Sequence, residues 1–309
     1  MKMKRTILLL FASISLAACG TAASNTTEQE TVTVTDGRGD VELPFQPEKV
    51  VVFDNGALDT LRALEVEEAI IGTVTQNPPA YLADFSNQFE NVGTLKEPNL
   101  ETLAELKPDL IIVSNRMSDF IEQLEEIAPV LWLTTSVDDY WTSVSDNIRT
   151  LGTIFGTEDA AEELVAETET HIEEIQTVTE NLDQKALVLL LNDGAISAYS
   201  TGSRFGYIFD TFGFQPVDEA IESSTHGQSI GYEGILEINP DIIFVVDRSK
   251  AIQAEGVDQM PLLDNEFIQK TNAFQNDQVI SLLPDLWYLS GGGVESLKLM
   301  MDEISAPFE

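Results

Sequence analysis

An internal repeat constrains the fold of this chain more than any other feature of its sequence. Residues 99–116 read NLETLAELKPDLIIVSNR and residues 231–248 read GYEGILEINPDIIFVVDR; the two segments align without gaps at an offset of 132, with seven of eighteen positions identical. Each copy is typical of a helix, a break at Pro-Asp, a buried strand and an arginine just past the strand's carboxyl end. The repeat therefore predicts two similar lobes.

Similar strand-and-helix units surround both copies of the repeat. Short runs of apolar and β-branched residues predict strands at 50–53, 69–73, 110–114, 186–191, 241–246 and 279–282. Their alternation with helical leucine spacing, as at 56–66, predicts an α/β fold with a mainly parallel central sheet in each lobe. Because ligands bind outside the carboxyl ends of strands in such sheets, Arg116 and Arg248 are expected at a cleft between facing lobes.

A long amphipathic segment separates the predicted lobes. Between 157 and 181, apolar or small residues recur at helical spacing with acids elsewhere, which predicts one helix of about 38 Å. We interpret it as a rigid strut that joins an N-terminal lobe at 31–156 to a C-terminal lobe at 182–309. Within the first lobe, TVTVT and VELPF flank Asp-Gly-Arg-Gly-Asp at 36–40 and predict a hairpin, so the embedded Arg-Gly-Asp is interpreted as a turn.

The amino terminus has the features of an export signal. Basic residues precede a short apolar run that ends in Leu-Ala-Ala-Cys at 16–19, which is typical of a bacterial lipobox. Cleavage would remove the signal peptide at 1–19 up to the cysteine and leave Cys19 as a lipid-bearing first residue, followed by a flexible tether at 20–30. The apolar run is too short to span a bilayer. The protein is therefore expected to be lipid-anchored to the cell membrane and to face outside, on a Gram-positive surface in preference to a periplasm.

Charge and composition exclude several classes of function. The formal net charge is −37, and loss of the three basic residues of the signal leaves −40, which argues against nucleic acid as a partner. The single cysteine excludes a disulfide within one chain. G-x-S-x-G, GxxxxGK[ST] and HExxH motifs are absent and there are only two histidines, so the sequence predicts neither an enzyme nor a three-histidine zinc site. In so acidic a chain each arginine that remains after processing is informative: Arg38, Arg62, Arg116, Arg149, Arg204 and Arg248.

Several motifs follow one another along the chain at the spacing of a known family: VVVFDNGALDTL, KPDLIIVS, TGSRFGYIFDTFGF, HGQSIGYEGILEINPDIIFVVDR and LWYLSGGG. Together with the lipobox and the hairpin, they make nearly the whole mature chain resemble the class III substrate-binding proteins of ABC importers. The likeness is greatest to the petrobactin-type, ferric-catecholate branch. It implies a monomer of two α/β lobes joined by a rigid helix, which binds a ferric siderophore in its cleft for iron transport. Fe(III) would then arrive as part of the siderophore and not as an intrinsic cofactor.

The resemblance also implies roles for individual residues. Arg116, Arg204 and Arg248 correspond to pocket arginines of that branch, whose positive charges match those of a trianionic ferric tris-catecholate. His226 and Tyr288 correspond to residues that ligate iron when the siderophore supplies only part of the donor set, a role that suits hard Fe(III). Without the resemblance, a loop histidine is more often solvated and a tyrosine after tryptophan more often packed. His171 falls on the acidic helix, where a solvated face accounts for it.

A further pair of residues is predicted to contact the importer. Glu101 and Glu233 occupy equal places in the two repeat copies, each at the start of a helix, and the resemblance implies that they meet arginines of the permease. Acids also favour the first turn of a helix for dipole reasons alone. Alternative ligands for the same fold are haem, cobalamin or a hydroxamate siderophore. A different class of function, a surface adhesin or structural lipoprotein, would need neither paired lobes nor arginines at strand ends.

Overall fold

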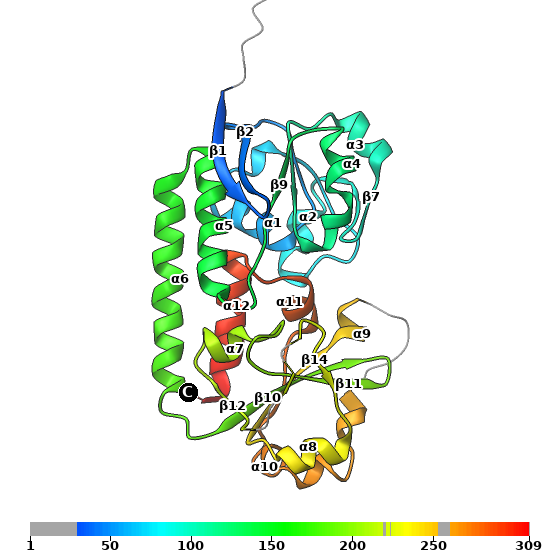
Figure 1. Ribbon diagram of the computed structural model, residues 1–309, viewed down its shortest axis with the longest axis vertical. Helices are drawn as coiled ribbons and strands as arrows, with labels where there is room; N and C mark the ends of the chain where they lie inside the picture. Colours follow the sequence, from blue (N-terminus) through cyan, green and yellow to red (C-terminus); the bar gives the residue numbers. More distant parts are fainter. Residues whose placement is uncertain (1–29, 219–220, 223, 253–259, 309) are drawn as a thin grey trace, which may run out of the picture.

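The computed structural model describes residues 30–308 except 219–220, 223 and 253–259, and these residues form two α/β lobes (Figure 1). The strands are β1 Thr31–Asp36, β2 Gly39–Pro44, β3 Val50–Val52, β4 Ile70–Thr73, β5 Glu90–Asn91, β6 Gly93–Thr94, β7 Glu97–Pro98, β8 Leu110–Val113, β9 Val130–Trp132, β10 Lys185–Asn192, β11 Ala195–Tyr199, β12 Gln215–Pro216, β13 Gln228–Ser229, β14 Ile242–Asp247 and β15 Val279–Ser281. The α-helices are α1 Asn55–Ala63, α2 Ala83–Ser86, α3 Leu100–Leu106, α4 Ile121–Glu125, α5 Tyr140–Phe155, α6 Glu158–Thr179, α7 Tyr207–Asp210, α8 Tyr232–Ile238, α9 Arg248–Ala251, α10 Asn272–Gln275, α11 Pro284–Leu289 and α12 Val294–Ser305. Within this described part of the chain, no helix combines the length and the apolar character that crossing a membrane requires.

Five parallel strands form the sheet of the N-terminal lobe, in the order β5-β4-β3-β8-β9. Its two central strands, β3 and β8, are fully buried because helices cover both faces of the sheet. In β3, Val50 and Val52 belong to the core formed with α1 and α5, whereas Val51 belongs to the core formed with α3 and α4. Because successive side chains of a strand point to opposite faces, an uninterrupted apolar run fits this position.

The sheet of the C-terminal lobe has the order β13-β11-β10-β14-β15, with β12 beside β10. Strands β10, β12, β13, β14 and β15 run in the same direction, and only β11, between β10 and β13, is antiparallel to its neighbours in this sheet. The central pair, β10 and β14, is almost entirely buried, in keeping with the apolar runs of the sequence. The predicted fold class of two α/β lobes with mainly parallel sheets is therefore confirmed.

The two copies of the repeat occupy equivalent places in the two lobes. Helices α3 and α8 each end at a residue in the left-handed conformation, Lys107 with φ 50° and Asn239 with φ 47°. In the first copy, Asp109 Oδ2 accepts a hydrogen bond of 3.0 Å from the backbone N–H that precedes β3. In the second copy, Asp241 Oδ2 accepts one of 3.0 Å from the first residue of β10. Each aspartate thus ties the strand after it, β8 or β14, to its neighbour in the sheet.

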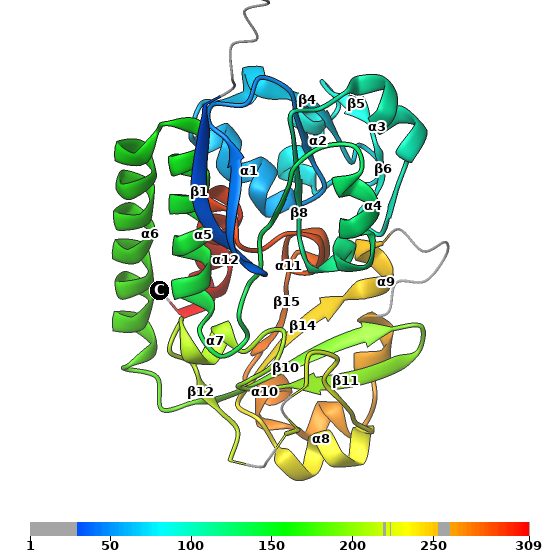
Figure 2. The ribbon, with the colours of Figure 1, turned by 45° about the horizontal axis from the view of Figure 1, so that its top comes forward.

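The long helix α6 runs beside both lobes, with α5 and α12 next to it (Figures 1 and 2). It buries one stripe of apolar and small residues and turns its acids to solvent, as the amphipathic spacing predicts. Helix α12, the last α-helix of the described residues, packs on α6 and on α1 of the N-terminal lobe. The lobe boundaries at 156 and 182 stay a prediction. They assign α12 to the C-terminal lobe, although this helix also contacts the N-terminal lobe.

Strands β1 and β2 form the hairpin predicted from the amino-terminal sequence. In its turn, the Arg38 guanidinium donates a hydrogen bond of 2.6 Å to the carbonyl of Val130 and forms ion pairs with Asp36 and Glu125. The guanidinium is therefore bound within the lobe, which supports the interpretation of Arg-Gly-Asp as a turn.

Candidate functional site

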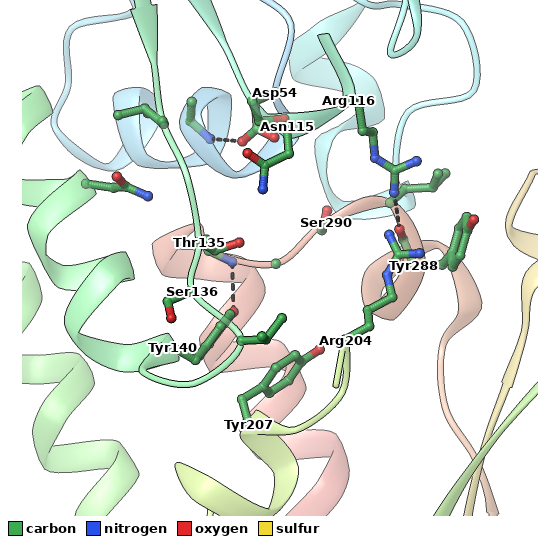
Figure 3. Close-up of a pocket in the computed structure, with 18 of the residues that line it drawn as sticks. Asp54, Asn115, Arg116, Thr135, Ser136, Tyr140, Arg204, Tyr207, Tyr288 and Ser290 are labelled. Atoms are coloured by element: carbon green, nitrogen blue, oxygen red, sulfur yellow. Dashed lines mark hydrogen bonds between the residues drawn. The ribbon is translucent and has the colours of Figure 1, made fainter. Parts of the chain in front are cut away.

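A cavity of about 480 Å³ lies between the lobes, where their strands end (Figure 3). From the N-terminal lobe it is lined by residues that follow β3, β8 and β9: Asp54, Ser114, Asn115, Arg116, Thr135 and Ser136. From the C-terminal lobe it is lined by loop residues, by the start of α7 and by the end of α11 with the segment after it: Ser203, Arg204, Tyr207, Thr225, His226 and 287–292. The position of Arg116 just past β8 is the one that the repeat predicts.

Tyr288 is the centre of a cluster that contains all three predicted arginines. The guanidinium carbons of Arg116, Arg204 and Arg248 lie 5.4, 4.3 and 5.4 Å from the centroid of its ring. Arg248 Nε donates a hydrogen bond of 2.7 Å to the phenol oxygen, and Arg116 Nη2 donates one of 2.8 Å to the backbone carbonyl of Tyr288. The structure therefore brings together residues that are up to 172 positions apart in the sequence.

The electrostatics of this cluster favour negative charge. Burial opposes ionisation of Tyr288, but the hydrogen bond from Arg248 and the charges of the arginines outweigh it and lower the pKa of the phenol below its ordinary value. Burial, and then the charge of Arg204, lower the pKa of Arg116. Among the described residues no ion pair includes these arginines, whereas Arg38 and Arg149 both pair with acids. Guanidinium groups gathered without carboxylate partners favour an anionic occupant.

Arg248 and His226 differ in how they approach the cavity. Arg248 is not among the residues that line it; the guanidinium lies against Tyr288, and Nη1 donates a hydrogen bond of 2.5 Å to Asn192 Oδ1. His226 is an exposed residue of the lining, and its backbone carbonyl accepts a hydrogen bond of 2.8 Å from the hydroxyl of Tyr199. The structure thus places His226 and Tyr288 on one cavity, and the ligand contact predicted for Arg248 stays a prediction.

Other residues singled out in the sequence lie away from the cavity or outside the described residues. Glu101 and Glu233 are exposed in the first turns of α3 and α8 and do not line the cavity. Cys19 lies outside the described residues. His171 is not on a solvated face: its side chain is 22% exposed, and Nε2 lies 3.3 Å from Asp302 Oδ1 of α12. That interpretation was wrong because α12 covers part of the polar stripe of α6.

The segment that follows Tyr288 is held by side chains of the N-terminal lobe, which local sequence patterns did not reveal. Asn55 Nδ2 donates to the carbonyl of Leu289 at 2.9 Å, and the hydroxyl of Tyr81 lies 3.0 Å from Ser290 Oγ. Asp59, which is fully buried, accepts hydrogen bonds of 3.0 and 2.8 Å from the first turn of α12. Burial raises the pKa of Asp59 to about 6. Tyr288 is therefore positioned by both lobes.

Aromatic rings form the floor of the cavity. Tyr140 of α5 and Tyr207 of α7 stack with ring centroids 4.3 Å apart, and Tyr207 stacks in turn on Trp287 at 5.9 Å. The Tyr140 hydroxyl accepts a hydrogen bond of 3.0 Å from the backbone N–H of Gly292. These residues were missed in the sequence because buried tyrosines are usually core residues, and only their contact across the two lobes distinguishes them.

Comparison with known proteins agrees with this architecture. The family model of the periplasmic binding proteins matches residues 50–286. Petrobactin-binding protein YclQ of Bacillus subtilis is 38% identical over 317 residues, which cover 99% of this chain and 100% of YclQ. The crystal structure of YclQ has a TM-score of 0.88 and covers 91% of this chain and 99% of the YclQ chain.

Two further solved structures are similar over most of the chain. The iron uptake ABC transporter substrate-binding protein PiuA of Streptococcus pneumoniae is 44% identical with a TM-score of 0.85, and the match covers 89% of this chain and 98% of PiuA. The periplasmic catecholate-siderophore binding protein VctP of Vibrio cholerae is 30% identical with a TM-score of 0.83, and the match covers 90% and 100%. Because the family model spans most of the chain and these relatives match both lobes, the chain belongs to the periplasmic binding protein family, with the class III fold.

Proposed function

We propose that this protein binds a ferric catecholate siderophore in the cavity between its lobes and, as a monomer, delivers it to the permease of an ABC importer. The observation that carries the proposal is the cluster of Arg116, Arg204 and Arg248 around Tyr288, without carboxylate partners among the described residues. A ferric tris-catecholate is a trianion with planar arrays of oxygen acceptors, which guanidinium groups bind in bidentate fashion. The names of YclQ and VctP point to the same class of ligand.

Iron enters this proposal as cargo. A siderophore with two catecholates leaves part of the Fe(III) coordination sphere open, and His226 and Tyr288 offer an imidazole and a phenol on the same cavity. The lowered pKa of Tyr288 favours the phenolate, the form that binds Fe(III). In this proposal the siderophore carries the iron, and the protein provides charge, shape and two supplementary donors.

The proposal is tested by titration of the intrinsic fluorescence of the protein, to which Trp287 contributes from the cavity wall, where it is 2% exposed. Ferric bis- and tris-catecholates are expected to quench the fluorescence saturably, and iron-free catecholates much less. The panel includes a ferric hydroxamate, haem and cobalamin, the alternatives for this fold. Tighter binding of any of these than of the catecholates would contradict the proposal, and quenching by none of the panel would favour the adhesin class.

Delivery to the permease leads to a separate prediction. Replacing Glu101 or Glu233 with alanine is expected to leave siderophore affinity unchanged and to reduce iron uptake severalfold, because both acids are exposed and lie outside the cavity. Glu173→Ala, on the exposed side of α6, is the matched control and is expected to leave uptake unchanged. Loss of ligand affinity in the first two variants, or normal uptake with both acids removed, would contradict a docking role.

Anchoring through Cys19 gives a further prediction. Because the proposed lipid is attached to this residue, Cys19→Ala is expected to release the protein to the medium or to block its processing, as measured by fractionation and by the mass of the mature chain. A control substitution in the proposed tether, Ser24→Ala, is expected to leave both unchanged. A Cys19→Ala protein that is processed normally and stays with the membrane would contradict the lipoprotein assignment.

A further inference from the structure

The two ends of the cavity differ in charge. Arg116, Arg204 and Tyr288 form one end, and Asp54 and Asn115 lie together at some distance from Arg204 on the N-terminal wall (Figure 3). Lys96 also lines the cavity. Among the described residues that line the cavity, Asp54 is the only carboxylate. A negative charge in the wall of an anion-binding cavity weakens binding unless the ligand presents something complementary to it.

The placement of Asp54 follows from the order of strands in the sheet. Asp54 comes shortly after β3, and Asn115 shortly after β8. Because these strands are parallel neighbours, their carboxyl ends bring the two residues close together. Asp54 is also the N-cap of α1, where its Oδ1 accepts a hydrogen bond of 2.9 Å from the backbone N–H of Ala57. Asp54 Oδ2 has no hydrogen-bond partner in the described part of the chain, and no cationic side chain there lies within 4.0 Å of the carboxylate.

The capping role does not require a charge that faces the cavity. Asparagine and serine cap helices about as well as aspartate, so one oxygen acceptor would be enough for α1. The charge of Asp54 acts within the cavity: after burial, it is among the influences that raise the pKa of Tyr140 on the floor. It also acts on Arg116, although no hydrogen bond joins the two residues.

From these observations we propose that Asp54 binds a cationic or N–H-donating group in the backbone of the siderophore, an ammonium group above all. This inference rests on the proposed function, because the iron-chelating oxygens must occupy the arginine end for the backbone to extend toward Asp54. The preferred ligand is then a ferric catecholate whose catechols are joined by an amine-bearing linker. Its charges would complement both ends of the cavity at once.

The test uses Asp54→Asn, which removes the charge and keeps the cap and the size of the side chain. Its probes are two synthetic ferric bis-catecholates of equal length, one with a secondary amine in the linker and one with an ether oxygen in its place. The wild-type protein is expected to bind the amine ligand about 10-fold more tightly or better, the range for a charge-assisted hydrogen bond. Asp54→Asn is expected to lose this preference, binding the amine ligand more weakly and the ether ligand equally or more tightly.

The outcomes separate this inference from the proposed function. If Asp54→Asn strengthens binding of both ligands by the same factor, Asp54 acts only as a helix cap whose charge affects both ligands equally, and the inference is overturned. If the wild-type protein binds both ligands without preference, the inference also fails while the proposed function stands; binding of neither would contradict the proposed function itself. Asp183→Asn, an exposed loop residue outside the cavity, controls for the loss of one charge. Thermal unfolding confirms that the variants are folded.

Discussion

Replacing Arg204 with alanine is expected to weaken binding of a ferric tris-catecholate by about 1.5–3 kcal/mol, roughly 10- to 150-fold in Kd. Arg204 lines the cavity and lies nearest to the centre of the cluster, 4.3 Å from the centroid of the Tyr288 ring. Arg116→Ala and Arg248→Ala are expected to fall in the same range, the second partly because it removes the hydrogen bond to the Tyr288 phenol. Fluorescence titration measures all three.

Matched variants distinguish the site from a general effect of charge. Arg204→Lys keeps the charge but not the planar fork of donors, so its loss is expected to be smaller than that of alanine. Arg149→Ala, at a position on α5 outside the cavity where the arginine pairs with Glu162, is expected to leave affinity unchanged. Unchanged affinity in all three cluster variants would show that the ligand binds elsewhere.

The largest selective effect is expected from His226→Ala combined with Tyr288→Phe. A ferric bis-catecholate leaves coordination positions open for protein side chains, whereas a hexadentate tris-catecholate leaves none. The double variant is therefore expected to weaken binding of the tetradentate ligand only. The expected loss is 10-fold or more, on the order of one strong charge-assisted contact. The hexadentate ligand would still be held by the arginines. The visible charge-transfer band of the tetradentate complex is expected to shift in the double variant.

The same pair of ligands gives a pH dependence with a definite sign. Ligating side chains must lose their protons to bind Fe(III), so tetradentate binding is expected to weaken as the pH falls and protons compete for the phenolate and imidazole. The lowered pKa of Tyr288 moves this competition to lower pH than for a free phenol. Equal losses for the two ligands, or a charge-transfer band that ignores the substitutions, would show that these side chains line the cavity without ligating iron.

Much of this architecture could be predicted because local sequence patterns determine it. The repeat at 99–116 and 231–248 predicted paired lobes, and its final arginines predicted positions just past β8 and β14. A run of apolar residues and the residue that follows it are neighbours in sequence, so the end of a parallel strand can be located without knowledge of its partners. Arg116 accordingly lies on the cavity wall. The roles assigned to Arg204, His226 and Tyr288 depended on family resemblance, because nothing in their local sequence specifies a ligand.

Only the tertiary structure decided the contacts between residues that are far apart in the chain. Asp59 caps α12 across 236 residues, and Asn55 holds the carbonyl of Leu289 across 234. The same is true of Arg248, which the strand-end rule places in the cleft but which lies against Tyr288 and does not line the cavity. Local spacing encodes which face of a helix or strand is buried. Side-chain hydrogen bonds between distant segments depend instead on how the lobes pack, and this packing made a buried tyrosine from one lobe the shared centre of the site.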